Sequence, residues 1–261
     1  MHIDDWKGYQ RINFTVGERQ SFLVRPKEAQ PGRPWIWRAE FPGAFDQADM
    51  ALLEAGWHLA YHCVSDRYGC PSSIDDMKEF FDTAVPAFDL HPKTVLLGFS
   101  RGGLYACNYA LRHPEDVAAL YLDAPVLDIR SWPGGLGAGL GEPGCWEECR
   151  RCYGLDTEEK VESFSDNPLD NAERLAQLSI PIMLVAGDSD VYVPYSENGE
   201  LFSERFEEAG GRITVIVKAG CNHHPHSLED PAPIQEFLEI FTGFKAFAVP
   251  FGSRHHKEHH R

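Results

Sequence analysis

Residues 95–104 read VLLGFSRGGL, and this stretch decides the fold. The apolar run before Gly98 predicts a buried strand, and the apolar pattern after Gly102 predicts a helix. Between them stands a Gly-x-Ser-x-Gly pattern with Ser100 at its centre. A strand that turns sharply into a helix holds such a serine in a strained conformation, with its hydroxyl above the sheet. Side chains at positions 98 and 102 would collide with neighbouring elements, so Ser100 is a candidate nucleophile. The alternative is an ordinary glycine-rich loop.

The composition is that of an acidic globular protein. The chain has 261 residues, with 24 Lys and Arg against 40 Asp and Glu, which gives a formal net charge of −16. This charge argues against nucleic acid and anionic membrane surfaces as partners. No apolar run is long enough to cross a bilayer, and residues 1–6 (MHIDDW) lack the apolar core of a signal peptide. We therefore expect a cytoplasmic protein, with a trimmed secreted form as the open alternative.

Three of the seven cysteines, Cys145, Cys149 and Cys152, lie close together in the sequence. Their spacing fits a short helix. A metal site or a redox pair is the alternative, but no second Cys or His pair follows at a zinc-like spacing. We therefore expect no metal, and the lack of a clear disulfide framework favours a reducing compartment.

Strands alternate with helices along most of the chain. The expected strands cover 9–16, 20–26, 34–41, 57–64, 93–98, 117–123, 181–187 and 213–217, and the main expected helices cover 46–55, 74–88, 101–112, 196–209 and 233–247. The first two strands predict an antiparallel hairpin. The later alternation predicts an α/β fold with a mostly parallel central sheet flanked by helices.

We expect a single domain over residues 1–252. Within it, residues 130–170 break the alternation with a glycine-rich stretch and short helical segments. This segment is expected to form a small insertion, a candidate lid, after the sixth strand. Ser73 is expected to cap the helix that follows it. The His-rich tail, residues 253–261, is expected to be disordered.

A nucleophilic serine needs a histidine to take its proton and a carboxylate to orient that histidine. Carboxylates follow strand 181–187, in the stretch GDSD at 187–190. We favour Asp190, because the turn after the strand presents a carboxylate three residues beyond the glycine. Asp188 is expected instead to orient the turn, and Asp123, after strand 117–123, is a more distant candidate.

The base candidates lie after the last strand, in the stretch GCNHHPHS at 220–227. His223 stands three residues past Gly220, where the loop can place an imidazole on the serine. His224 is the next candidate and His226 the last, and loop structure or substrate contact is the other interpretation of these two. A histidine cluster also suggests metal, but no His-Glu-x-x-His pattern accompanies it.

An oxyanion hole requires two N–H groups aimed at the developing negative charge. The backbone N–H of Arg101, the residue after the candidate nucleophile, is expected to be one donor. The second is expected from Phe41 or Glu40, in the loop that follows residues 34–39 of the third expected strand. Arg38, Glu40 and Arg101 therefore come near the site. They form either an ion-pair network that braces the loops or a site in which an arginine binds a polar group of the substrate.

Aromatic residues in loops expected near the pocket are further substrate-binding candidates. Aromatic rings stack on sugars or contact acyl groups, although they also anchor loops. The candidates for substrate contact are Tyr68, Trp132, Trp146, Tyr192, Arg38 and His224.

Three segments, 98–103 (GFSRGG), 187–190 (GDSD) and 220–223 (GCNH), resemble the catalytic segments of the α/β-hydrolase superfamily, in its order of serine, acid and histidine. The resemblance covers about residues 20–245. Residues 35–41 (WIWRAEF) and 223–228 (HHPHSL) are similar to a poorly characterised bacterial branch near the prolyl-oligopeptidase-like and acyl-esterase hydrolases. Members of that branch are often found beside carbohydrate-degrading enzymes. The resemblance implies the α/β-hydrolase fold and hydrolysis of an ester, with an acylated sugar as one substrate class.

The expected activity is cleavage of a small-molecule carboxylic ester by Ser100, His223 and Asp190 through an acyl-enzyme. This chemistry requires no metal and no organic cofactor. Peptidase, lactonase and thioesterase activity on the same three residues are alternatives. A non-catalytic binding protein on a hydrolase fold is a further one.

Overall fold

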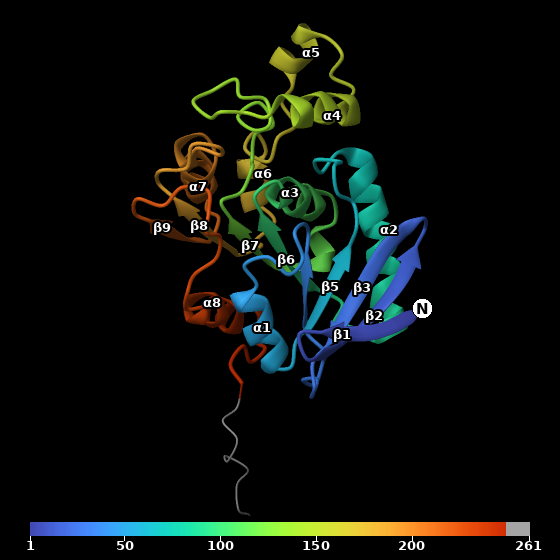
Figure 1. Ribbon diagram of the computed structural model, residues 1–261. Helices are drawn as coiled ribbons and strands as arrows, with labels where there is room; N and C mark the ends of the chain where they lie inside the picture. The colour runs from blue at the N-terminus through green and yellow to red at the C-terminus, as the bar shows by residue number, and fades with distance from the viewer. Residues whose placement is uncertain (249–261) are drawn as a thin grey trace, which may run out of the picture.

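The computed structural model describes residues 1–248. Within them, one sheet of nine strands crosses the molecule in the order β1-β2-β3-β5-β4-β6-β7-β8-β9 (Figure 1). Its strands are β1 (His2–Trp6), β2 (Tyr9–Val16), β3 (Arg19–Arg25), β4 (Trp35–Arg38), β5 (His58–His62), β6 (Thr94–Phe99), β7 (Val117–Asp123), β8 (Ile182–Gly187) and β9 (Ile213–Lys218). The pairs among β1, β2, β3 and β5 are antiparallel, and the remaining pairs are parallel. The expected mostly parallel sheet is confirmed.

Helices cover both faces of this sheet (Figure 1). The α-helices are α1 (Gln47–Glu54), α2 (Pro71–Phe88), α3 (Gly102–Arg112), α4 (Pro143–Tyr153), α5 (Glu158–Ser163), α6 (Ala172–Ala176), α7 (Gly199–Glu208) and α8 (Ala232–Thr242), and short 3-10 turns cover Pro114–Asp116 and Tyr195–Glu197. The apolar faces of α2, α3, α6 and α7 pack on one side of the sheet, and those of α1 and α8 pack on the other. No helix of the described residues is long and apolar enough to span a membrane.

The first strand, β1, is absent from the sequence-based expectation. It pairs antiparallel with β2 through a turn at Lys7 and Gly8. Its sequence, HIDDW, is acidic and largely exposed, so it shows no apolar alternation. As a consequence, the insertion at 130–170 follows the seventh strand and not the sixth. The predicted tail, 253–261, and the last residues of the predicted domain lie outside the described residues.

Two helix ends also differ from expectation. Helix α2 begins at Pro71 and not after Ser73, because Pro71 occupies the first turn, where a missing N–H costs nothing. Helix α8 ends at Thr242 and not near residue 247, because Gly243 adopts a left-handed conformation with φ of 75°.

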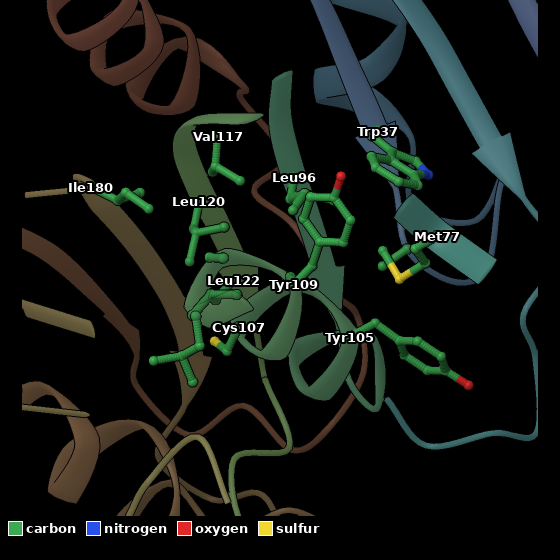
Figure 2. Packing of buried hydrophobic residues seen from close by; sticks show 14 of the residues in the cluster. Trp37, Met77, Leu96, Tyr105, Cys107, Tyr109, Val117, Leu120, Leu122 and Ile180 are labelled. Atoms are coloured by element: carbon green, nitrogen blue, oxygen red, sulfur yellow. The ribbon is translucent and has the colours of Figure 1, made fainter. Parts of the chain in front are cut away.

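Helix α3, which follows the candidate nucleophile, is fixed by the largest apolar cluster. Cys107 and Tyr109 project from α3 toward Leu122 of β7 and Leu96 of β6 (Figure 2). All four side chains are fully buried. Each buried side chain of this size contributes about 1.5–3 kcal/mol relative to an exposed one. These contacts hold the middle and second half of α3 against β6 and β7.

A third apolar cluster joins the insertion to the rest of the fold. Leu104 of α3 and the buried Tyr68 pack with Cys149 and Val161, which belong to α4 and α5. In Figure 1, these two helices lie at the top of the molecule. Cys145, Cys149 and Cys152 all lie on α4, as the helical interpretation of their spacing predicts, and all three are free thiols.

Candidate active site

Ser100 lies in the turn between β6 and α3, with φ of 52°. A Cβ on Gly98 would stand 2.9 Å from a backbone oxygen of the helix, so only glycine fits there. At Gly102, however, the nearest atom to an added Cβ is 3.4 Å away, whereas at Gly103 it is 2.7 Å away, in Pro125. The prediction that a side chain at position 102 would collide with its neighbours is thus wrong, and the collision occurs at position 103 instead. The reason is that α3 presents its second residue, and not its first, to the loop after β7.

Three side chains from separate segments form a continuous hydrogen-bonded chain. Ser100 Oγ lies 2.9 Å from His223 Nε2, and His223 Nδ1 lies 2.6 Å from Asp190 Oδ2. All three residues are less than 9% exposed. The carboxylate holds the Nδ1–H tautomer, which leaves Nε2 free to accept the serine proton. This arrangement has the geometry that nucleophilic catalysis by a serine requires.

The turn after β8 holds Asp190 in place. Its second carboxylate oxygen, Oδ1, accepts hydrogen bonds from the N–H groups of Tyr192 and Val193, each at 2.9 Å. Asp188 is exposed and accepts a hydrogen bond from the Gly220 N–H at 2.8 Å. Asp188 therefore braces the turn, which is the role that the sequence suggested for it.

Asn222 joins the acid loop to the histidine loop, a role that was not predicted from the sequence. Its Oδ1 accepts hydrogen bonds from the Val191 N–H at 3.0 Å and from the His223 N–H at 2.8 Å. The two loops meet because the parallel strands β8 and β9 are neighbours in the sheet. An asparagine directly before a candidate base is the signal that would have indicated it.

A second histidine–aspartate pair lies beside the first. His226 Nδ1 is 2.8 Å from Asp123 Oδ1, and both residues are buried. Tyr121 donates its hydroxyl to Asp123 Oδ2 at 2.7 Å, and the Ser227 N–H donates to the same oxygen at 2.9 Å. Asp123, the distant candidate for the acid, thus orients a different imidazole. The sequence contained both residues but did not indicate that they pair.

His224 packs edge to face against both other imidazoles and is exposed. Desolvation lowers the pKa of His224 below its usual range, and the neighbouring His226 and His223 lower it further. His224 therefore stays neutral at physiological pH. The three rings form one wall of the pocket above Ser100.

Arg38 does not face this pocket, which corrects its predicted contact with the substrate. Its side chain is fully buried, with Nε 2.8 Å from Asp49 Oδ2 and Nη2 2.6 Å from the carbonyl oxygen of Ala44. Its guanidinium carbon lies 3.9 Å from the ring centroid of Phe99. Burial raises the pKa of Asp49, and Arg38 opposes this shift. Arg38 therefore holds the loop after β4 in place through its hydrogen bonds to that loop's backbone.

That loop carries the candidate oxyanion donors. Phe41 adopts a left-handed backbone conformation with φ of 52°. Among residues 1–248, the backbone N–H groups of Glu40, Phe41 and Arg101 have no hydrogen-bond acceptor. All three thus remain candidates to bind a developing oxyanion next to Ser100.

The side chain of Arg101 is held by two carboxylates. Its Nε lies 3.1 Å from Glu40 Oε2 and its Nη1 3.0 Å from Asp66 Oδ1. Burial raises the pKa of Glu40, and the charge of Arg101 and the hydroxyl of Ser65 oppose this shift. Because the guanidinium is already paired, the geometry favours the bracing network over the binding of a substrate carboxylate.

A pocket of about 410 Å³ opens above Ser100. Its lining residues are Phe41, Ala44, Phe45, Phe99, Ser100, Arg101, Trp132, Cys145, His223, His224 and His226. Phe41, Arg101, Trp132 and His224 were candidates from the sequence. His226 was a candidate as well, whereas Ala44, Phe45 and Cys145 were not, because only the fold brings their segments together.

Three of the predicted aromatic contacts lie elsewhere. Tyr68 is fully buried and donates its hydroxyl to Glu148 at 2.8 Å, so it anchors the insertion. Trp146 lines a separate pocket with Arg150. Tyr192 is 44% exposed with its ring centroid 6.1 Å from that of His223, and it does not line the pocket above Ser100.

Comparisons with known proteins agree with this architecture. A family model described as the α/β hydrolase fold matches residues 56–141. The fold is similar to those of puromycin hydrolase (18% identity, 83% of this chain and 36% of that chain, TM-score 0.64) and an esterase (16%, 85% and 74%, 0.61). It is also similar to a putative lipase from Acinetobacter baumannii (15%, 91% and 92%, 0.57).

The chain spans little more than a third of the length of puromycin hydrolase. No sequence among curated proteins matches the chain significantly. At these identities the similarity to solved structures demonstrates a shared fold and nothing finer. The family match over residues 56–141 and this shared architecture show that the chain has the α/β hydrolase fold.

Proposed function

We propose that the protein is a serine hydrolase that cleaves a carboxylic ester through an acyl-enzyme. The observation that carries this proposal is the chain of hydrogen bonds from Ser100 through His223 to Asp190, at 2.9 and 2.6 Å, beneath an open pocket. A non-catalytic binding protein would have no need for a buried carboxylate behind that imidazole.

In the first half-reaction, Ser100 Oγ attacks the ester carbonyl while His223 Nε2 takes the hydroxyl proton. The imidazolium so formed is stabilised by Asp190. The Arg101 N–H and an N–H from Phe41 or Glu40 bind the oxyanion of the tetrahedral intermediate. When that intermediate collapses, the carbon–oxygen bond of the ester breaks, and His223 returns the proton to the leaving alcohol.

In the second half-reaction, His223 takes a proton from a water molecule, which attacks the acyl-enzyme. The carboxylic acid leaves as Ser100 recovers its proton. Each loss of an oxyanion donor is expected to slow turnover by about 10²–10³-fold.

The pocket wall supports a small, neutral ester as the substrate class. Phe41, Phe45 and Trp132 supply apolar surface, and His224 and His226 supply polar edges. Aromatic and polar groups together suit an acylated sugar, which combines an acyl chain with hydroxyl groups. The pairing of Arg101 with Glu40 and Asp66 argues against an anionic substrate.

Hydrolysis of short p-nitrophenyl esters, followed by a panel of acetylated and feruloylated sugars, tests the proposal. Ser100→Ala is expected to abolish turnover. Ser163→Ala, a matched change at an exposed serine of α5, is expected to leave turnover unchanged. Hydrolysis of amides, lactones or thioesters with no turnover of any ester would contradict ester hydrolysis. An inert protein whose Ser100 is not labelled by an organophosphonate would favour the binding protein.

A further inference from the structure

The three imidazoles above Ser100 are arranged as a set of ligands. One ligand atom from each of His223, His224 and His226 lies within 4.8 Å of the other two. The ring centroids are 4.8, 4.9 and 4.9 Å apart, and the ring planes are inclined by 80–85° to one another. The three rings therefore pack edge to face in one compact cluster and do not stack face to face.

These separations match those of a metal bound by three imidazoles. With nitrogens about 2.1 Å from the ion, ring centroids are expected roughly 4.6 Å apart for octahedral and 5.3 Å apart for tetrahedral ligand angles. The observed values fall inside this interval. The ligand atoms, which lie within 4.8 Å of one another, must approach to about 3.0–3.4 Å around such an ion, which side-chain rotations of the three rings would have to supply.

Carboxylates orient two of the three rings in the way that metal-binding histidines require. His223 and His226 each direct Nδ1 to an aspartate, at 2.6 and 2.8 Å. Such a carboxylate fixes the tautomer and leaves Nε2 to bind an ion, and it makes that nitrogen more basic. His224 makes no hydrogen bond within residues 1–248, so both of its nitrogens are available. The two buried carboxylates also balance the charge of a divalent cation.

We propose that His223, His224 and His226 form a binding site for Zn²⁺, and that the bound ion switches the hydrolase off. The ion takes the Nε2 lone pair of His223, which is the lone pair that accepts the proton of Ser100. The binding part of this proposal stands on the cluster alone, and the inhibition rests on the proposed function. Metal is therefore a reversible inhibitor of this site and takes no part in the chemistry.

Zinc binding is measured by isothermal titration calorimetry of chelator-treated full-length chain. His255, His256, His259 and His260 of the tail would compete for metal, so all four are replaced by Gln in every sample. One ion per chain is expected, and His224→Gln is expected to weaken binding by about tenfold or more. His226→Gln is expected to have the same effect, and His2→Gln, at an exposed position, is expected to have none.

Separate readouts distinguish the two parts of the proposal. Ser100→Ala is expected to bind zinc as tightly as the parent, whether or not the parent hydrolyses esters. If the parent is active, zinc is expected to inhibit it with a constant that matches its dissociation constant, and His224→Gln, normalised to its own metal-free rate, is expected to be less sensitive.

Three outcomes would overturn the proposal. The first is no binding by the protein with the substituted tail, and the second is unchanged binding in His224→Gln with its fold intact by circular dichroism. The third is binding abolished by His113→Gln, because His113, Glu115 and Asp116 form the other group with ligand spacing among the described residues. Zinc bound at full occupancy without loss of ester hydrolysis would refute the inhibition alone.

Discussion

Replacing Arg38 by methionine tests the role assigned to the buried ion pair beneath the oxyanion loop. Arg38 and Asp49 are 0% and 1% exposed, and their charged atoms lie 2.8 Å apart. Removing one partner of a buried pair costs about 3–5 kcal/mol, because the other charge is left in a low-dielectric site. The hydrogen bond to Ala44 is lost as well. We therefore expect Arg38→Met to lower the free energy of unfolding by about 4 kcal/mol.

The same substitution should also slow turnover. Arg38 holds the loop that carries Phe41, whose N–H is a candidate oxyanion donor. If the loop loosens, the donor moves out of position, and turnover is expected to fall by up to about 10²-fold with little change in the Michaelis constant.

Urea unfolding followed by tryptophan fluorescence measures the stability, with two matched variants beside it. Arg19→Met removes an arginine from an ion pair of equal length at the surface, with Asp76, and should cost less than about 1 kcal/mol. The double variant Arg38→Met, Asp49→Leu should recover most of the lost stability, because no buried charge remains. The reasoning is refuted if Arg38→Met costs no more than Arg19→Met, or if the double variant is less stable than Arg38→Met.

Three further predictions concern the acid, the elbow and the pH dependence of folding. Asp190→Asn should lower kcat by about 10⁴-fold, because the histidine would adopt the wrong tautomer, and Asp188→Asn should lower it by less than tenfold. Steady-state kinetics on a p-nitrophenyl ester measure both effects, and equal losses, or a larger loss in Asp188→Asn, would contradict the assignment of Asp190 as the acid. Gly103→Ala should destabilise the fold by about 1–3 kcal/mol, and Gly102→Ala by less. The reason is that an added Cβ meets atoms at 2.7 Å in the first case and at 3.4 Å in the second. Thermal unfolding measures both losses, and a larger loss in Gly102→Ala would contradict the close packing described at Gly103. Burial lowers the pKa of His62 from 6.5 to about 4, so the stability gained from the neutral ring is complete above pH 6.5 and is lost as the pH falls through 4. Relative to His62→Gln, the wild-type protein should lose about 3 kcal/mol of its free energy of unfolding between pH 7 and pH 4. If the free energies of unfolding of the two proteins change in parallel over this pH range, the prediction is wrong.

The sequence predicted the features that depend on short stretches of chain. Ser100 was indicated by an apolar strand, two glycines and a helix within ten residues, and the structure gives it the expected turn. Asp190 and His223 were each indicated by their distance from a glycine at the end of a strand. The structure brings both to Ser100, and their catalytic roles remain predictions.

Long-range pairing was beyond sequence reasoning. The sequence around Arg38 does not indicate whether its side chain contacts a substrate or a buried carboxylate. Its partner, Asp49, lies on the next helix, so only the fold shows that they pair. The pair of His226 and Asp123 joins residues 103 positions apart. β1 was missed for the opposite reason, since its acidic sequence gives no apolar alternation and its pairing with β2 alone makes it a strand.

The central claim is that Ser100, activated by His223, forms the acyl-enzyme. Its most direct test is intact-protein and peptide mass spectrometry after exposure to a p-nitrophenyl ester and to an organophosphonate. The account predicts a single adduct, located on Ser100, that is absent in Ser100→Ala and forms far more slowly in His223→Ala. A wild-type protein that acquires no adduct, or acquires it on another residue while turning over the ester, would contradict it.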